Sequence, residues 1–222
     1  MCFEFYKLLR REMRISLSSF IGLLTYSTFF FLAILIFVFS VGSNLERLND
    51  FYLPIIWVVS LFSLILISES FVLHDHLDGG LKELQFLGFS EELILMSKAL
   101  TMWIILMIPN LIFFPICSIL FSINLENLIK LILNILIASP TLILISLLSA
   151  FFSIQVKRNK LLQFVIAMPF YIPVIIFATS TNKISIMGGM QNNNFFILTG
   201  IFFITLPLSL LAGKLIIKET NN

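Results

Sequence analysis

Apolar residues form six long runs in this chain, and none of the runs contains a charged side chain. They cover residues 15–45, 51–68, 99–125, 131–156, 161–182 and 184–213. A helix needs roughly 20 largely apolar residues to cross the hydrocarbon of a bilayer, and each run reaches or approaches that length. The pattern predicts an all-α integral membrane protein with six transmembrane helices, in a single transmembrane domain over residues 1–222.

The segment before the first run has a different pattern. In residues 3–18, apolar side chains recur at helical spacing on one face, and basic side chains fall mostly on the other. This pattern favours a helix in the headgroup region, which we expect over residues 1–19. The alternative is a plain basic flank that only sets topology. The following uncharged run exceeds the roughly 7–15 residues of a signal-peptide core, so we interpret it as a retained first span.

The first two spans are expected at about 20–41 and 51–71. The loop between them is short, which predicts antiparallel neighbours. The later spans are expected at about 99–122, 128–154 and 161–181 and within 184–213. Each of these four contains at least one interior proline. Such prolines favour kinks, which serve either a moving bundle or packing alone.

Composition narrows the class of protein. Hydrophobic residues make up 59% of the chain and charged residues only 12%, against about 25% charged in soluble domains. The net charge of +2 is dispersed, so no basic cluster indicates a nucleic-acid partner. No acidic or basic residue falls in the middle of a predicted span, which argues against transport coupled to protons or sodium. Energy for any transport would have to come from elsewhere.

The basic residues are unevenly divided between the two sides of the predicted bundle. With the N-terminus in the cytoplasm, the inner side receives Lys7, Arg10, Arg11, Arg14, Lys82, Lys98, Lys157, Arg158, Lys160, Lys214 and Lys218. Only Arg47, Lys130 and Lys183 then lie outside. This excess of bases on one side is what the positive-inside rule requires, so we expect both termini to be cytoplasmic.

Residues 69–98 form the chemically distinctive segment between the second and third spans. It holds six acidic and two basic residues, and both histidines of the chain. A glycine pair, Gly79 and Gly80, precedes leucines at helical spacing, and Ser90 precedes two acids as a helix N-cap does. We therefore expect a helix end, a glycine turn, a short amphipathic helix, a second break and the start of the third span.

This segment is predicted to be a cytoplasmic coupling loop. Leu81, Leu84 and Leu87 could fill an apolar groove of a soluble partner. The net charge of −4 over the segment would favour a basic patch on that partner. The alternative is an ordinary solvated loop.

His74, Asp75, His76 and Asp78 together raise the question of a metal or haem site. The two histidines are two positions apart, so on a helix they point about 200° away from each other. We therefore favour a polar cap on the second span, and we predict no metal site and no catalytic residue.

A family resemblance rests on particular motifs. The run from Pro54 to Ser90, PIIWVVSLFSLILISESFVLHDHLDGGLKELQFLGFS, resembles haem exporter protein B (CcmB). The likeness continues at Pro140 to Leu142 and in MPFYIPVIIFAT at residues 168–179. It covers nearly the whole chain. The chain departs from the family pattern at Gly80, commonly a small hydroxyl residue, and at Lys82, commonly an acid.

The resemblance implies an ABC-2-type permease-like fold and a membrane subunit of the ABC-type cytochrome c maturation complex. Such a subunit couples a partner's ATP hydrolysis to haem export or to release of the haem-loaded chaperone. The chain has no G-x-x-x-x-G-K-S/T phosphate loop, so the ATPase is expected to be a separate cytoplasmic subunit. The residues expected to couple to it are Asp75, Asp78, Gly79, Leu81 and Leu84, with Glu69 as an acid at the membrane edge.

The same resemblance implies further partners: other cytochrome c maturation membrane proteins, the haem chaperone, membrane lipids and a possible second copy of the chain. No cofactor is expected to bind directly, although haem could be handled through the complex. The location would be the bacterial inner membrane or, alternatively, the mitochondrial inner membrane. Two other functions stay open, an ABC exporter of another hydrophobic compound and a passive membrane scaffold for assembly factors.

Overall fold

The computed structural model describes residues 2–18, 20–42, 45–156, 160–180 and 193–219, and these residues form eight helices without a strand. The helices are α1 (Cys2–Ser18), α2 (Phe20–Val41), α3 (Leu45–Leu77), α4 (Gly80–Phe86), α5 (Glu91–Leu120), α6 (Leu125–Gln155), α7 (Lys160–Ser180) and α8 (Asn193–Glu219). Six of them, all except α1 and α4, are long and apolar enough to cross a membrane. The predicted all-α membrane fold is therefore confirmed.

The helix bounds differ from the predicted spans mainly around the 69–98 segment. Helix α3 runs on to Leu77, and α5 already begins at Glu91. Only residues 78–90 therefore lie between the two long helices, and α4 occupies most of them. A charged residue ends an apolar run, but it does not end a helix. Helices α3 and α5 therefore both continue beyond the apolar zone into the charged segment.

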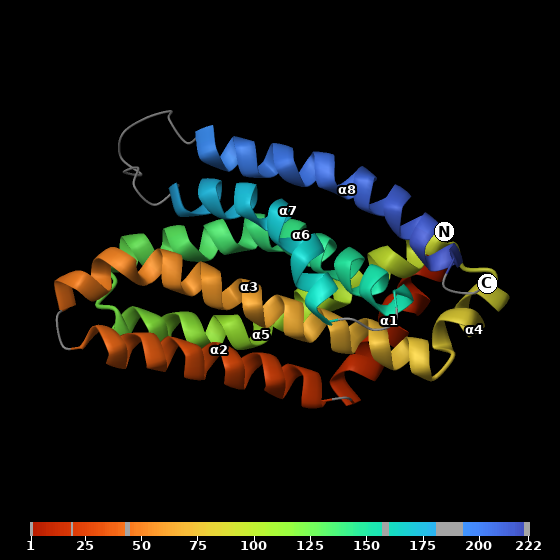
Figure 1. Ribbon diagram of the computed structural model, residues 1–222, viewed down its shortest axis with the longest axis horizontal. Coiled ribbons are helices and arrows are strands. Elements are labelled where there is room, and N and C mark those ends of the chain that lie inside the picture. The colour runs from red at the N-terminus through yellow and green to blue at the C-terminus, as the bar shows by residue number, and fades with distance from the viewer. Residues whose placement is uncertain (1, 19, 43–44, 157–159, 181–192, 220–222) are drawn as a thin grey trace.

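Helix α6 lies at the centre of the bundle and packs against α3, α5, α7 and α8. It is buried along much of its length, including Leu131, Leu142 and Leu147. Helix α2 packs along α3, as predicted for antiparallel neighbours (Figure 1). Large apolar side chains such as Phe39 and Phe203 point outward, as expected of helices in contact with lipid.

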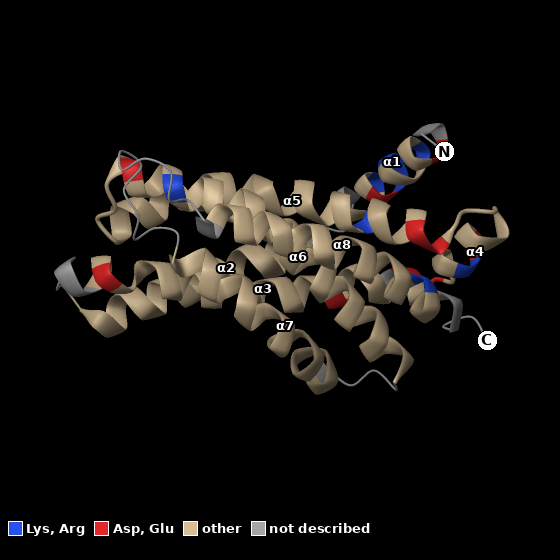
Figure 2. Ribbon diagram, turned by 90° about the horizontal axis from the view of Figure 1, so that it is seen from above, with Lys and Arg blue, Asp and Glu red and all other residues tan. Residues whose placement is uncertain are grey.

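Charged residues gather towards the two ends of the bundle, and the long middle is almost uncharged (Figure 2). The start of α1, helix α4 and the end of α8 all lie at one of these ends (Figure 1). Helix α1 is tilted away from the neighbouring spans (Figure 2). Its Leu8 is buried while Lys7, Arg10 and Arg14 are exposed, which is the predicted amphipathic arrangement.

The seven prolines all lie within helices, in α3 and in every span from α5 onward. Pro54 lies in α3, the second span, and the other six prolines lie in the third to sixth spans, α5 to α8. Three bases used in the topology prediction, Lys157, Arg158 and Lys183, lie outside the described residues.

Candidate functional site

Helix α4 lies at the charged end of the bundle. A glycine in the left-handed conformation stands on each side of this helix. Gly79 precedes the helix with a φ of 72°, and Gly88 follows it with a φ of 84°. The Gly88 amide donates to the Gln85 carbonyl at 2.9 Å, and the Phe89 amide donates to the Leu84 carbonyl at 3.2 Å. These two bonds form a Schellman motif, in which glycine avoids the cost of a Cβ. The predicted glycine turn and second break are confirmed.

The next helix begins as the sequence indicates. The Ser90 hydroxyl accepts a hydrogen bond from the Leu93 amide at 3.4 Å, so the predicted N-cap of α5 is confirmed. Glu91 and Glu92 lie in the first turn, where carboxylates offset the positive end of the helix dipole. Glu92 also pairs with Lys214 of α8 at 2.8 Å, which ties the end of the last span to this region.

A group of four charged residues, three of them buried, joins α1, α3 and α5, and we call Arg11, Glu12, Asp75 and Lys98 the ionic cluster. The Lys98 ammonium donates to Glu12 Oε2 at 2.9 Å and also to Asp75 Oδ2. The Arg11 guanidinium donates to Glu12 Oε1 at 2.7 Å and lies 3.8 Å from Asp75 Oδ1. The side chains of Lys98, Glu12 and Asp75 are only 1%, 3% and 7% exposed.

The cluster is chemically balanced. Two cations face two carboxylates, so the cluster as a whole carries no net charge. Removing charges from water is costly, and only close pairing with further hydrogen bonds offsets that cost. Since each carboxylate contacts both cations, the three helices are held in one relative position. The cluster has the character of a junction between the surface helix α1 and two membrane spans.

Gly80, the first residue of α4, lies directly against this cluster. A Cβ atom at Gly80 would lie 3.0 Å from Arg11 Nη2 and 3.2 Å from Asp75 Oδ1. Both distances are shorter than ordinary van der Waals contacts. The missing side chain therefore allows α4 to pack close to the place where α1 meets α3.

Sequence reasoning missed three of the four members of the cluster, since Arg11 entered it only as a base on the inner side. Lys98 was interpreted as the end of a loop, and Glu12 was given no role. A signal for Glu12 was present, because it lies four residues after Leu8 and so shares the apolar face of α1. Nothing local distinguished Lys98 from a charge that flanks a membrane span.

The predicted coupling residues have different environments. Asp75 is buried in the ionic cluster, and Leu81 and Leu84 are buried beneath α4. Asp78 is exposed, next to the Gly79 turn. The structure thus brings these residues together at one end of the bundle, but it turns three of the five inward. Their predicted role towards a partner stays a prediction.

The apolar side chains that are exposed on α4 and on the residues next to it are not among the five predicted coupling residues. Phe86 is 90% exposed and Leu87 is 66% exposed. Leu77, the last residue of α3, is also exposed. We call Leu77, Phe86 and Leu87 the α4 apolar surface. Of the predicted leucines, only Leu87 contributes to it.

The remaining polar residues of the segment do not form a metal site in the described part of the chain. No group of three or more histidine, cysteine, aspartate or glutamate side chains there could hold a metal ion. His76 is exposed. Glu69, predicted at the membrane edge, lies inside α3 and is partly buried, two turns before the helix ends.

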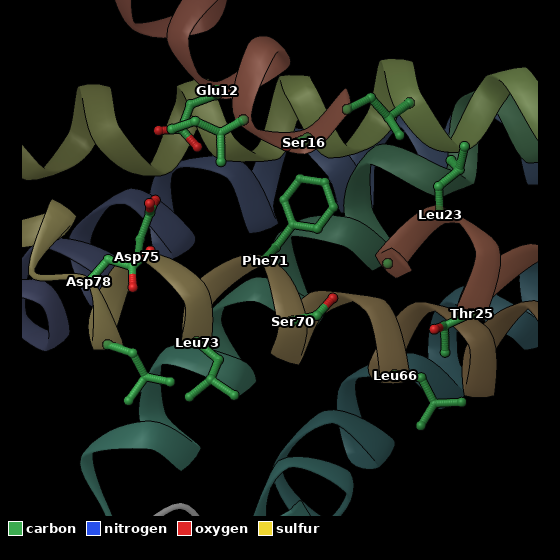
Figure 3. Close-up of a pocket in the computed structure, with 14 residues that line it drawn as sticks. Glu12, Ser16, Leu23, Thr25, Leu66, Ser70, Phe71, Leu73, Asp75 and Asp78 are labelled. Atoms are coloured by element: carbon green, nitrogen blue, oxygen red, sulfur yellow. The ribbon is translucent and has the colours of Figure 1, made fainter. Parts of the chain in front are cut away.

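A cavity of about 370 Å³ opens beside the ionic cluster, between α1, α2 and α3 (Figure 3). Glu12, Asp75 and Asp78 lie at one end of it, and Leu23, Thr25 and Leu66 lie at the other (Figure 3). The cavity therefore has a polar end near the membrane surface and an apolar body along α3.

Deeper in the bundle, neutral side chains link the spans. The Tyr26 hydroxyl donates to Asn110 Oδ1 at 2.8 Å, joining α2 to α5. The Trp103 indole donates to Ser139 Oγ at 2.9 Å, joining α5 to α6. These neutral polar side chains therefore serve packing between helices, since hydrogen bonds between spans satisfy groups that lipid would leave unpaired.

Comparison with known proteins places the chain in a family. A family model described as CcmB protein matches residues 3–218. The chain is similar to the Heme exporter protein B of Bradyrhizobium diazoefficiens, with 28% identity over 184 residues, which cover 83% of each chain. It is also similar to that of Haemophilus influenzae, with 26% identity over 176 residues, which cover 79% of this chain and 80% of the relative.

A third relative extends the match almost from end to end. The Heme exporter protein B of Pseudomonas aeruginosa is 24% identical over 212 residues, which cover 94% of this chain and 95% of the relative. The family match therefore includes the whole ionic cluster and α4. The resemblance inferred from the sequence motifs is confirmed, and this multi-pass membrane protein belongs to the CcmB protein family.

Proposed function

We propose that the chain is the membrane subunit of an ABC-type transporter complex for cytochrome c biogenesis. In this role it couples ATP hydrolysis by a separate subunit to haem export or to release of a haem-loaded chaperone. Two relatives that match 83% and 94% of this chain are named Heme exporter protein B, and the matches cover 83% and 95% of their own length. Because the sequence lacks a phosphate loop, we assign no ATPase activity to the chain itself.

The observation that carries the proposal is the α4 apolar surface at the charged end of the bundle. Exposed apolar side chains outside the membrane spans are characteristic of a protein interaction site. Phe86 and Leu87 stand at the end of a short helix whose other apolar side chains are buried. Such a helix matches the apolar groove of a soluble partner. We assign this partner as the cytoplasmic ATPase.

Leu81 and Leu84 then serve as the anchor of α4 rather than as its outer contact. They hold the helix against the bundle, and the Gly79 turn connects it to α3. Asp75 connects the same end of α3 to α1 and α5 through the ionic cluster. A force applied to α4 is therefore transmitted to three helices together.

The partner shifts the bundle only if its contacts differ between two conformations of the bundle. Nucleotide binding and hydrolysis supply that difference when they change the position of the ATPase surface against α4. The junction at the ionic cluster would then tilt α1, α3 and α5 as one unit. This is how we expect ATP chemistry outside the membrane to reach the spans.

We place the α4 end in the cytoplasm of a bacterium and the spans in its inner membrane. The exposed bases Lys7, Arg10 and Arg14 of α1 lie at this end, as the positive-inside rule requires. The even number of spans returns the last helix to the same end. A cysteine placed at Phe86 should therefore react with an impermeant thiol reagent only after the inner membrane is opened.

The docking proposal is tested by co-purification of the ATPase with Phe86→Asp and Leu87→Asp variants. The matched control is Leu125→Asp, which introduces the same charge at an exposed position at the opposite end of the bundle. We expect the two α4 variants to lose at least about nine-tenths of the bound ATPase, since truncation of an apolar anchor typically costs more than 1 kcal/mol of binding. The control should retain it.

Cytochrome c yield in the same strains tests the functional assignment separately. We expect yield to fall in parallel with ATPase binding. Unchanged ATPase binding in both α4 variants would refute the docking surface. Full maturation with an ATPase that cannot hydrolyse ATP would instead indicate a passive scaffold and refute coupling.

A further inference from the structure

The cavity between α1, α2 and α3 has the shape and polarity of a site for an amphiphile. At about 370 Å³ it falls within the roughly 300–1,000 Å³ typical of ligand sites. Its wall follows α3 from Leu66 to Leu77, a rise of about 16 Å along a helix axis. Leu23, Leu66 and Phe71 line the apolar body (Figure 3). An extended apolar chain fits this wall.

Acidic side chains line the polar end of the cavity, and Arg11 of α1 lies beside these acids rather than in the lining. Glu12, Asp75 and Asp78 line it, and Arg11 lies against the first two of these carboxylates while remaining 30% exposed. Arg14 follows one turn later on α1 and is exposed. A guanidinium is suited to phosphate through paired hydrogen bonds. The carboxylates are suited to a primary ammonium group, which donates three hydrogen bonds.

This combination discriminates among amphiphiles. A choline headgroup has no N–H to donate to the carboxylates. A headgroup with net negative charge would lie against Asp78, the acid of the lining that is not part of the ionic cluster. Haem is a poor match, because its propionates would lie against the same acid, and the described residues of the lining include no histidine, cysteine or methionine to bind its iron. A phosphate linked to a primary amine satisfies both kinds of charge.

We propose that this cavity binds one phospholipid with a phosphoethanolamine headgroup. Its acyl chain lies along the end of α3, its amine faces Asp78 and the neighbouring carboxylates, and its phosphate faces the arginines of α1. The bound lipid fills the space between the surface helix and the first two spans. It thereby supports the position of α1 beside the ionic cluster. This proposal does not depend on the proposed role in haem export.

The test uses the full chain purified in detergent and native mass spectrometry with added lipids. Dioleoyl phosphatidylethanolamine is compared with phosphatidylcholine and phosphatidylglycerol that carry the same acyl chains. We expect one tightly retained ethanolamine lipid per chain. Its retention should exceed that of either competitor by about tenfold, the effect of one or two charge-assisted hydrogen bonds.

Two variants locate the bound lipid. Gly22→Leu places a side chain at the cavity wall, where a Cβ lies 3.3 Å from Ser70 Oγ. Its control is Gly200→Leu in α8, where an added Cβ meets no atom within 4 Å. We expect the first variant to lose the retained lipid and the control to keep it. Asp78→Asn, at an exposed position, should reduce the preference for ethanolamine over choline several-fold without affecting folding.

Each contrary result overturns the proposal. Equal retention of the three lipids would remove the headgroup assignment, and a preference for phosphatidylglycerol would reverse its electrostatic basis. Retention unchanged in Gly22→Leu would place the lipid elsewhere. If Gly22→Leu does not fold, an unchanged headgroup preference in Asp78→Asn is sufficient to reject the site.

Discussion

Replacement of Lys98 by methionine tests the energetic role of the ionic cluster directly. Methionine has nearly the same length but no charge, so the substitution creates little cavity. Glu12 and Asp75 would keep their buried positions and lose the ammonium that both contact. Arg11 would remain at 2.7 Å from Glu12, so Asp75 would be the carboxylate left with the poorer partner.

Removal of one partner from a buried ion pair typically costs about 3–5 kcal/mol. Because Arg11 retains part of the compensation, we expect a loss of about 3 kcal/mol in the free energy of unfolding. For a chain of this size that corresponds to a fall of roughly 6–12 °C in Tm. Thermal unfolding of the detergent-purified protein, followed by tryptophan fluorescence, measures the shift.

Two comparisons separate the cluster from a general effect of losing a lysine. Lys130→Met removes another buried lysine, but its partner Glu126 is 57% exposed and remains hydrated, so we expect a loss below about 1 kcal/mol. The triple variant Glu12→Gln, Asp75→Asn and Lys98→Met leaves no buried charge. We expect it to recover most of the stability, as neutral replacements of buried ion pairs do.

The reasoning fails in either of two cases. A Tm of Lys98→Met equal to that of the wild type would mean that the cluster does not hold the three helices together. A triple variant as unstable as the single one would mean that packing around Lys98, rather than its charge, stabilises the junction.

Three further predictions concern single positions. Gly80→Val should lower stability by about 1–3 kcal/mol through overpacking against the cluster, whereas Gly200→Val on α8 should have little effect; both are compared by Tm. Ser122 has a φ of 53°, so Ser122→Gly should raise stability by about 1 kcal/mol, and an unchanged or lower Tm would contradict this. Tyr26→Phe deprives Asn110 of its donor at 2.8 Å and should cost about 0.6–1.7 kcal/mol, measured by unfolding in detergent.

Local sequence determined most of the secondary structure. A span depends on the length of an uncharged run, which can be counted without knowledge of neighbours. The N-cap at Ser90 and the turns at Gly79 and Gly88 depend only on residues a few positions away. For this reason the six spans, the short helix and its two breaks were all predictable.

The outward face of α4 was not predictable in the same way. Leu81, Leu84 and Leu87 share a spacing that indicates an amphipathic helix, but spacing does not say whether the bundle or a partner covers the apolar face. The structure buries the first two and exposes the third, together with Phe86. That choice depends on how α4 packs on α3, which is a tertiary contact.

What the sequence by itself determined is the membrane architecture, because burial in lipid requires every span to satisfy its own backbone and to avoid charge. Only the tertiary structure decided which charged side chains pair with one another in the interior and which face water. Glu12 and Lys98 are 86 positions apart, and Asp75 and Lys98 are 23 apart. Whether such residues face water or one another depends on which helices meet, since a charge is stable in the interior only when distant parts of the chain bring it a partner.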